Sequence, residues 1–287
     1  MARGCVGLGV VVLVLPFQEI SKLNKPKTSL IEYACADSIA LITLNRAEKL
    51  NAFTDDMVRE LGAVLHRFDM DEEAQVAILS GRGRAFSSGA DVRQRQLRSR
   101  DDLAQAGGPV APDAQSSDLL LRCINWKPVI AAVHGYALGM GLGLALECDL
   151  VVAETGTKFQ ITETSRGLGA SKFGALLSFR GHWGFATEMA LTGRFFTAEE
   201  AHAAAVIDRV APSGAYLDMA RELATAIARN PPLGVRANVR TRRWRMEEAQ
   251  RDAGRQASLS KLYLTEDFAE AVRAFSEKRP PAPFKGR

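Results

Sequence analysis

Short apolar runs alternate with amphipathic segments from residue 38 onward, and this alternation predicts strands and helices in turn. Four runs are apolar and rich in β-branched residues, which is typical of buried strands: 38–45, 76–80, 128–133 and 150–153. Beyond residue 170 the pattern becomes mainly helical. The chain is therefore predicted to be an α/β protein with a helical C-terminal region.

Helices are predicted where apolar residues recur at helical spacing, several of them behind a capping residue such as Thr54 or Thr197. The predicted helices are 55–69, 117–126, 142–148, 197–205, 216–229 and 265–278. Residues 93–115 are polar and contain two glycines and two prolines, which favours a mobile segment or a lid.

Composition excludes several classes of protein. The 287 residues are 47% hydrophobic and 24% charged with a net charge of +4, unlike disordered, collagen-like or disulfide-rich chains. The four cysteines lack metal-ligand spacing, so we expect reduced thiols, no metal site and a cytoplasmic location. The apolar run 5–17 is too short to span a bilayer, and no other run is longer, so we expect no membrane association.

Two glycine-containing turns, 86–91 and 135–143, each follow a predicted strand. Glycine lets the backbone approach a ligand, and the start of a helix offers unpaired N–H groups. Two such N–H groups, one from each turn, are suited to stabilising one oxyanion. Each turn alone is a weak signal, and the spacing is not that of a dinucleotide-binding fingerprint.

Four segments resemble the crotonase, or enoyl-CoA hydratase/isomerase, superfamily: ITLNRAEKLNAF (42–53), AFSSGADV (85–92), KPVIAAVHGYALGMGLGLALECD (127–149) and EKRPPAPFKGR (277–287). The match extends in order over about residues 30–287. The resemblance implies a crotonase-like spiral of ββα units with a C-terminal helical trimerisation region, assembled as a homotrimer or a dimer of trimers. We therefore expect a disordered or dispensable extension (1–29), a core with the acyl-CoA site (30–214) and an oligomerisation region (215–287).

The same resemblance implies an acyl-CoA thioester whose carbonyl accepts hydrogen bonds from the N–H groups of Ala90 and Met140. Most relatives have glycine at the position of Met140. Of the two glutamates of family hydratases, Glu163 is present, whereas the other position is Gly143. The implied acyl-CoA contacts are Lys49, Ala52, Ala90, Asp91, Val92, Arg93, Met140, Gly141, Phe284 and Lys285, the last two from a neighbouring subunit. The thioester is the substrate, and no cofactor is expected.

The loss of one carboxylate leaves the reaction open. Hydration is most easily achieved with two carboxylates, one to orient water and one to donate a proton. A shift between 3-enoyl and 2-enoyl thioesters needs only one, which removes a proton and returns it. Hydratase activity is commoner in the superfamily and is slightly favoured. The alternatives are a double-bond isomerase and a catalytically degenerate member that binds acyl-CoA.

Other residues have simpler interpretations. Without the resemblance, Glu163 is expected to be a solvated carboxylate and Asp91 a turn-fixing residue. Glu147 is expected to be a surface or salt-bridged residue, with replacement of the missing carboxylate as the alternative. Arg166 is placed to lower the pKa of Glu163 or to pair with it, and His134 is expected to be a hydrogen-bonded structural residue. The five arginines of 236–245 favour a solvated helix face, with CoA phosphates second and nucleic acid an unfavoured third interpretation.

Overall fold

The computed structural model describes residues 29–108, 126–258 and 260–287. The predicted helix 117–126 lies almost wholly outside these residues, as do the N-terminal extension and part of the polar segment 93–115. Within the described residues, no helix is both long and apolar enough to cross a membrane.

A six-stranded sheet forms the centre of the molecule, with strand order β1-β2-β3-β4-β6-β9. The first two strands pair antiparallel and every later pair is parallel. The strands are β1 (Ile31–Ala36), β2 (Ile39–Leu44), β3 (Val76–Gly81), β4 (Val129–Val133), β6 (Leu150–Glu154) and β9 (Arg209–Ala211). The four strands expected from the apolar runs are all present, within one or two residues at each end.

Alternate residues of each strand face opposite layers, because side chains in a strand point to alternate faces. Ala77 and Leu79 pack in the core that includes α2 (Asp55–Met70) and α6 (Met140–Glu147). Val76 and Ile78 pack on the other face against α10 (Tyr216–Ala228). Both faces are thus covered by helices, as is usual for a parallel sheet.

A second sheet brings the site residues together. Its strands are β5 (Tyr136–Leu138), β7 (Lys158–Gln160) and β8 (Phe196–Thr197), in the order β5-β7-β8. β5 ends just before α6, and β7 ends just before Glu163, so their parallel pairing places these two chain segments side by side.

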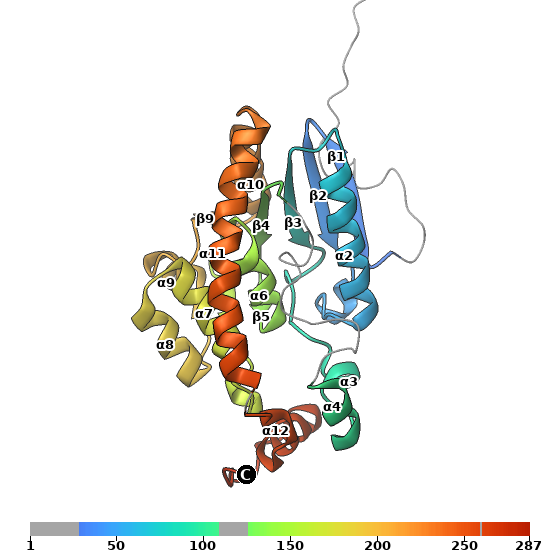
Figure 1. The fold of residues 1–287 in the computed structure, drawn as a ribbon, viewed down its shortest axis with the longest axis vertical. Coiled ribbons are helices and arrows are strands. Elements are labelled where there is room, and N and C mark those ends of the chain that lie inside the picture. The colour runs from blue at the N-terminus through green and yellow to red at the C-terminus, as the bar shows by residue number, and fades with distance from the viewer. Residues whose placement is uncertain (1–28, 109–125, 259) are drawn as a thin grey trace, which may run out of the picture.

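The remaining helices form most of the second half of the chain. They are α7 (Ser171–Arg180), α8 (Trp183–Thr192), α9 (Ala198–Ala203), α11 (Pro232–Ser258) and α12 (Glu266–Glu277), with the 3₁₀ turns η1 (Ala47–Lys49), η2 (Thr164–Arg166) and η3 (Leu262–Leu264). In Figure 1 the long helix α11 runs down the molecule to α12, beside which the chain ends. This is the α/β arrangement with a helical C-terminal region that the sequence predicts.

Several elements were not expected from the sequence, among them one strand and two helices in the first half of the chain. β1 is an edge strand whose residues are mostly only partly buried, so it lacks a continuous apolar run. The short helices α3 (Val92–Arg95) and α4 (Arg100–Ala106) lie in the polar segment that was expected to be a mobile segment or a lid. Each begins at a side-chain cap, Asp91 and Ser99 respectively, so local capping fixes part of this segment as helix.

Candidate active site

The two glycine turns lie against each other. Ser87 donates its N–H to the carbonyl of Tyr136 at 3.0 Å, and Leu138 donates to the carbonyl of Ser87 at 3.0 Å. Gly89 has φ +93°, and a Cβ at this position would lie 2.6 Å from the Leu138 carbonyl oxygen and 3.5 Å from the Met140 nitrogen. The close approach therefore needs glycine, and it places the N–H groups of Ala90 and Met140 at the same point in the fold.

Both expected oxyanion donors are available there. Met140 is the first residue of α6, where backbone N–H groups lack acceptors within the helix and the helix dipole is positive. The Ala90 N–H has no acceptor among the described residues. Gly139, with φ +47°, turns the chain into α6 directly before the second donor.

Glu163 brings a carboxylate to the same turn. A Cβ on Gly139 would lie 3.1 Å from Oε1 of Glu163, so the carboxylate is beside the residue that precedes Met140. Burial raises the pKa of Glu163 to about 7, while a hydrogen bond from Thr162 and the charge of Arg166 act in the opposite direction. The carboxyl group is thus poised to take up and release a proton near neutral pH. A fully solvated surface role for Glu163 is excluded.

An aromatic ring occupies the place of the second carboxylate. A Cβ on Gly143 would lie 2.5 Å from Cε1 and 3.2 Å from Cδ1 of Phe173, a residue of α7 that is 8% exposed. Glu147, one turn further along α6, is 1% exposed and accepts a hydrogen bond from Gln250 of α11 at 3.4 Å. The expectation of a surface position for Glu147 was wrong, because α11 covers this side of α6.

The expected CoA contacts from the first half of the chain also gather at the first turn. Phe53 donates to the carbonyl of Gly89 at 2.8 Å, and Asp91 donates to the carbonyl of Phe53 at 2.9 Å. These bonds hold the segment with Lys49 and Ala52 against the segment Ala90–Arg93. Asp91 caps α3 and pairs with Arg46 at 2.8 Å, which is the turn-fixing role expected from the sequence.

Phe284 and Lys285 lie elsewhere in this chain. The Lys285 N–H donates to Asp267 at 2.8 Å and its Nζ pairs with Glu266 at 3.1 Å, so the terminal segment follows the start of α12. Phe284 is 54% exposed. Their expected role in a neighbouring subunit's site stays a prediction.

Several charged residues stabilise the fold around the site. Arg243 is 6% exposed and pairs with Asp149, which also pairs with Arg242 at 3.4 Å. The expectation that the arginine-rich stretch is a solvated face was therefore wrong for these two residues. His134 bonds the carbonyl of Gly83 at 2.9 Å and stacks on Tyr216, which is the structural role expected.

Two residues beside the site had no signal in the sequence. Phe173 is one apolar residue in a helix, and its contact with Gly143 depends on how α7 packs on α6. Arg95 is one of several basic residues in a polar segment, yet its side chain is completely buried and its Nη1 lies 3.5 Å from Sδ of Met140.

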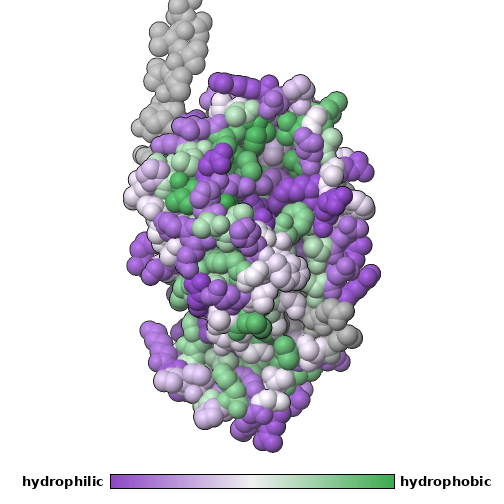
Figure 2. Space-filling view, turned by 90° about the vertical axis from the view of Figure 1, so that its left-hand side faces the viewer, coloured by the Kyte–Doolittle hydropathy of each residue, from purple (hydrophilic) through white to green (hydrophobic). Residues whose placement is uncertain are grey.

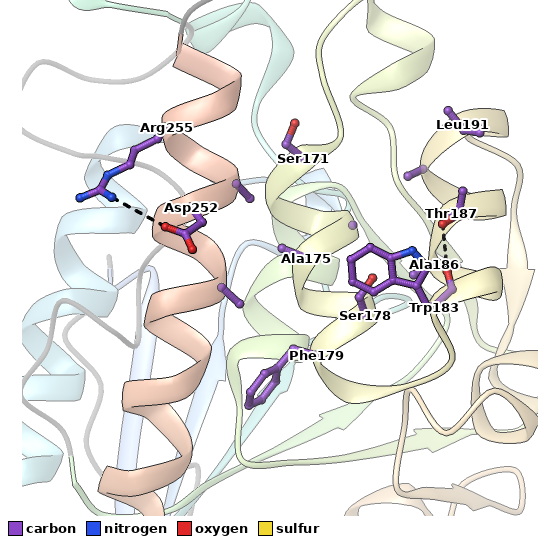
Figure 3. A pocket seen from close by; sticks show the side chains of 14 residues that line it. Ser171, Ala175, Ser178, Phe179, Trp183, Ala186, Thr187, Leu191, Asp252 and Arg255 are labelled. Atoms are coloured by element: carbon purple, nitrogen blue, oxygen red, sulfur yellow. Dashed lines mark hydrogen bonds and ion pairs between the residues drawn. The ribbon is translucent and has the colours of Figure 1, made fainter.

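A separate groove of about 810 Å³ lies between α7, α8 and α11. Its lining includes Phe179, Trp183 and Leu191, and none of the expected site residues (Figure 3). Trp183 and Leu191 are 73% and 74% exposed. Figure 2 views the side of the molecule that carries α8 and α9, where apolar patches lie between polar residues. The groove is thus a surface feature distinct from the oxyanion turns.

Among the described residues, no cluster of three or more His, Cys, Asp or Glu side chains is suited to a metal ion.

The fold is a crotonase fold, and comparison with known families agrees. The model of the family "Enoyl-CoA hydratase/isomerase" matches residues 34–287. The chain belongs to this family.

Relatives differ in the acyl group that their names specify. The chain is 35% identical to the 2,3-dehydroadipyl-CoA hydratase of Escherichia coli (strain K12), over 87% of this chain and 96% of the relative. It is 32% identical to the (E)-benzylidenesuccinyl-CoA hydratase of Thauera aromatica, over 88% and 97%. A solved carnitinyl-CoA dehydratase from Mycobacterium avium 104 superposes with a TM-score of 0.74 at 31% identity, over 91% of this chain and all of that one.

Proposed function

We propose that this protein acts on the C=C bond of an acyl-CoA thioester through an enolate, with Glu163 as its single proton carrier. The observation that carries the proposal is the position of the Glu163 carboxylate, with a pKa raised to about 7, beside the turn that presents the Met140 N–H. The thioester carbonyl oxygen accepts hydrogen bonds from Ala90 and Met140. Each such donor is worth about 2.7–4 kcal/mol in other oxyanion holes.

The geometry favours isomerisation between 3-enoyl and 2-enoyl thioesters. Ionised Glu163 removes a proton from C2 of the 3-enoyl thioester, and the electron pair of that C–H bond forms the enolate. Glu163 then returns the proton to C4 as the double bond moves to C2–C3. One carboxylate completes the cycle, and no oxidant, cofactor or added water is consumed. The ring of Phe173 against Gly143 supports this choice, because it leaves an apolar surface where a second carboxylate would orient water.

Hydration of a 2-enoyl thioester is the second candidate. It is favoured by relatives at 32–35% identity that are named as hydratases. In that reaction Glu163 would act on both the water and the C2 proton, without the second glutamate.

The assembly and location of the enzyme belong to the same proposal. We infer a homotrimer or a dimer of trimers, with the apolar groove at α7, α8 and α11 as a contact surface between subunits. A cytoplasmic location is supported by Cys35 and Cys148, which are both free thiols. The division at residues 29/30 and 214/215 stays a prediction, and α10, just after the second boundary, packs on the main sheet.

Assays on paired 3-enoyl-CoA and 2-enoyl-CoA substrates test the proposal. We expect isomerisation in the wild type and a loss of at least a hundredfold in Glu163→Gln, since general acid–base groups contribute about 10²–10⁴. Glu222→Gln, an exposed change on α10, is the matched control and should keep full activity. Hydration without isomerisation would select the second candidate. Binding of acyl-CoA without turnover of either substrate would overturn both and leave a degenerate binding protein.

A further inference from the structure

Arg166 is the last residue of the 3₁₀ turn η2, and this turn begins at the proposed proton carrier. Glu163 caps the turn in a helical conformation, and its carbonyl accepts the N–H of Arg166 at 2.9 Å. Side chains three residues apart lie above one another in a 3₁₀ turn, so those of Glu163 and Arg166 project from the same side. The positive charge of Arg166 also lowers the pKa of Glu163. Arg166 is therefore part of the surroundings of the proposed site.

The guanidinium of Arg166 has no acidic partner in the part of the chain that the structure describes. It forms neither an ion pair nor a hydrogen bond there, so the pairing with Glu163 that was one expectation from the sequence is not formed. The group stacks instead on the ring of Phe275, with Cζ 3.5 Å from the ring centroid. Arg166 is half-buried, and burial lowers its pKa. A partly desolvated charge without a partner is unfavourable, and an anionic ligand would supply the partner.

Helix α12 fixes the guanidinium beside the site. Phe275 belongs to α12, and a Cβ on Gly167 would lie 3.1 Å from the backbone of Phe268, near the start of the same helix. A small apolar cluster joins the start of α12 to the segment after the first oxyanion donor and to the segment after η2, through Phe268, Val92 and Leu168. Both ends of α12 thus hold η2 in place, and Arg166 is a fixed point three residues from Glu163.

The position of Arg166 indicates which part of the ligand reaches it. In the proposed reaction Glu163 takes a proton from C2, so the acyl chain is the part of the ligand beside η2. The pantetheine arm leaves from the sulfur on the other side of the carbonyl carbon, and the CoA phosphates lie at the far end of that arm. The CoA contacts expected from the first half of the chain gather at the other turn, with Lys49 and Ala90–Arg93. An anion that pairs with Arg166 is therefore carried by the acyl chain.

Carboxylate is the anion that fits this guanidinium. Stacking on Phe275 covers one face of the planar group and leaves its edges, which carry the N–H donors, for a ligand. Two parallel N–H groups on such an edge match the two oxygens of a carboxylate. The ring also holds the guanidinium in one plane, which lowers the entropy lost when a carboxylate binds.

We propose that Arg166 binds a second carboxylate carried by the acyl chain, so that the substrates are dicarboxylic acyl-CoA thioesters. This inference rests on the proposed function only in requiring that an acyl-CoA binds with its acyl group beside Glu163. It does not depend on which reaction follows.

Binding of saturated, unreactive ligands tests the inference apart from catalysis. Calorimetric titration would compare succinyl-, glutaryl- and adipyl-CoA with butyryl-, valeryl- and hexanoyl-CoA, which have the same numbers of acyl carbons without the second carboxylate. We expect at least one dicarboxylic ligand to bind tenfold or more tightly than its partner. In Arg166→Met this preference should fall below twofold, while the monocarboxylic ligands keep their affinity within twofold.

Arg273→Met is the matched control, because it removes a positive charge from an exposed position of α12, the helix that carries Phe275. It should keep the preference. Arg166→Gln removes the charge but keeps a polar side chain, and it provides the same reading if Arg166→Met does not fold, as judged by circular dichroism. The monoamide of the preferred dicarboxylic ligand has nearly the same shape without the charge. It should bind the wild type at least fivefold more weakly than the acid, and this comparison needs no variant.

Four results would overturn the inference. They are equal binding of both ligand series by the wild type, equal binding of the acid and its monoamide, a preference that persists in Arg166→Met, and a preference that is lost equally in Arg273→Met. Equal loss of both series in Arg166→Met would assign Arg166 to holding α12 on η2, which also contradicts the proposal. Failure of the wild type to bind any acyl-CoA would contradict the proposed function itself, whereas binding without preference contradicts the Arg166 site alone.

Discussion

The ring of Phe173 packs directly against the backbone of Gly143, leaving no room for a side chain at position 143. The two positions are therefore coupled: a residue larger than glycine at 143 requires a smaller one at 173. This pair determines how many carboxylates face the proposed substrate, and two of its consequences can be measured.

The first consequence concerns stability. Gly143→Ala should lower the free energy of unfolding by about 1–3 kcal/mol, since an added methyl group meets a packed ring. Gly62→Ala is the control: it also lies within a helix, α2, but a Cβ there meets nothing within 4 Å. That change should stabilise the protein by about 0.5–1 kcal/mol. Urea unfolding of both variants measures their free energies of unfolding. Equal changes in the two variants would show that the Phe173 ring moves aside without cost.

The second consequence concerns the reaction. Gly143→Glu combined with Phe173→Ala should supply a second carboxylate together with the space for it. We expect the double variant to hydrate 2-enoyl-CoA at least tenfold faster than the wild type, while Phe173→Ala alone gains nothing. Parallel hydration assays check this. A double variant that folds but hydrates no faster would show that the second carboxylate does not limit water addition.

The pKa of Glu163 should govern how activity depends on pH. The carboxylate must be ionised to remove a proton, so kcat/KM should rise as pH increases through about 7. Arg166→Met removes a positive charge that lowers this pKa, and its profile should shift to higher pH. A profile that is flat between pH 6 and 8, or an unchanged midpoint in Arg166→Met, would contradict this assignment.

The same group should leave a signature in stability. Its pKa is raised from 4.5 to about 7 in the folded state, so the folded protein holds this proton more tightly than the unfolded chain does. The resulting stabilisation is complete below pH 4.5 and is lost as pH rises through about 7. Glu163→Gln does not titrate, so it should gain stability relative to wild type over this interval. Thermal unfolding at several pH values measures the trend, and a constant difference would show that the carboxyl group is not buried.

The buried pair of Arg243 and Asp149 provides a stability test within the arginine-rich stretch. Arg243→Met leaves the Asp149 carboxylate with less compensation and should cost about 3–5 kcal/mol. Arg245→Met, two residues further and exposed, should change the free energy of unfolding by less than about 0.5 kcal/mol. Denaturant titrations check both values, and similar losses would indicate a role for the stretch as a whole.

The groove at α7, α8 and α11 provides the test of assembly. Light scattering after size exclusion should give three or six times the 31.1 kDa mass of one chain. Trp183→Asp should weaken the assembly, while Met70→Asp, an equally exposed apolar position on α2, should not. A wild type that stays monomeric at micromolar concentration would contradict both the trimer and the role of the groove.

The sequence predicted those helices and strands that form because of residues close together in the chain. The buried strands show apolar runs, and Thr54 and Thr197 accept the capping bonds expected of them, from Met57 and Glu200. It was insufficient for β1, whose partly buried residues form no such run, and for α3 and α4, which are short and polar.

The site divides in the same way. Each turn was identified from glycines a few residues apart, and Glu163 from the family resemblance, four residues after Phe159. Phe173 and Arg95 were missed because their roles depend on residues 30 to 45 positions away, Gly143 and Met140, and such contacts have no local pattern. Glu147 was misplaced for the same reason, since α11 covers it from about a hundred positions further along the chain.

The oxyanion donors belong to the main chain, and this has a consequence for mutational tolerance. Every amino acid except proline has a backbone N–H, so nearly all substitutions at positions 90 and 140 leave the two donors in place. Random mutagenesis should therefore find that positions 90 and 140 accept most amino acids but not proline. Gly89 should accept fewer substitutions than Ala90, because a Cβ at position 89 would collide with the Leu138 carbonyl oxygen. In the proposed site, methionine at position 140 therefore changes the side chain that faces the acyl group and keeps the backbone donor.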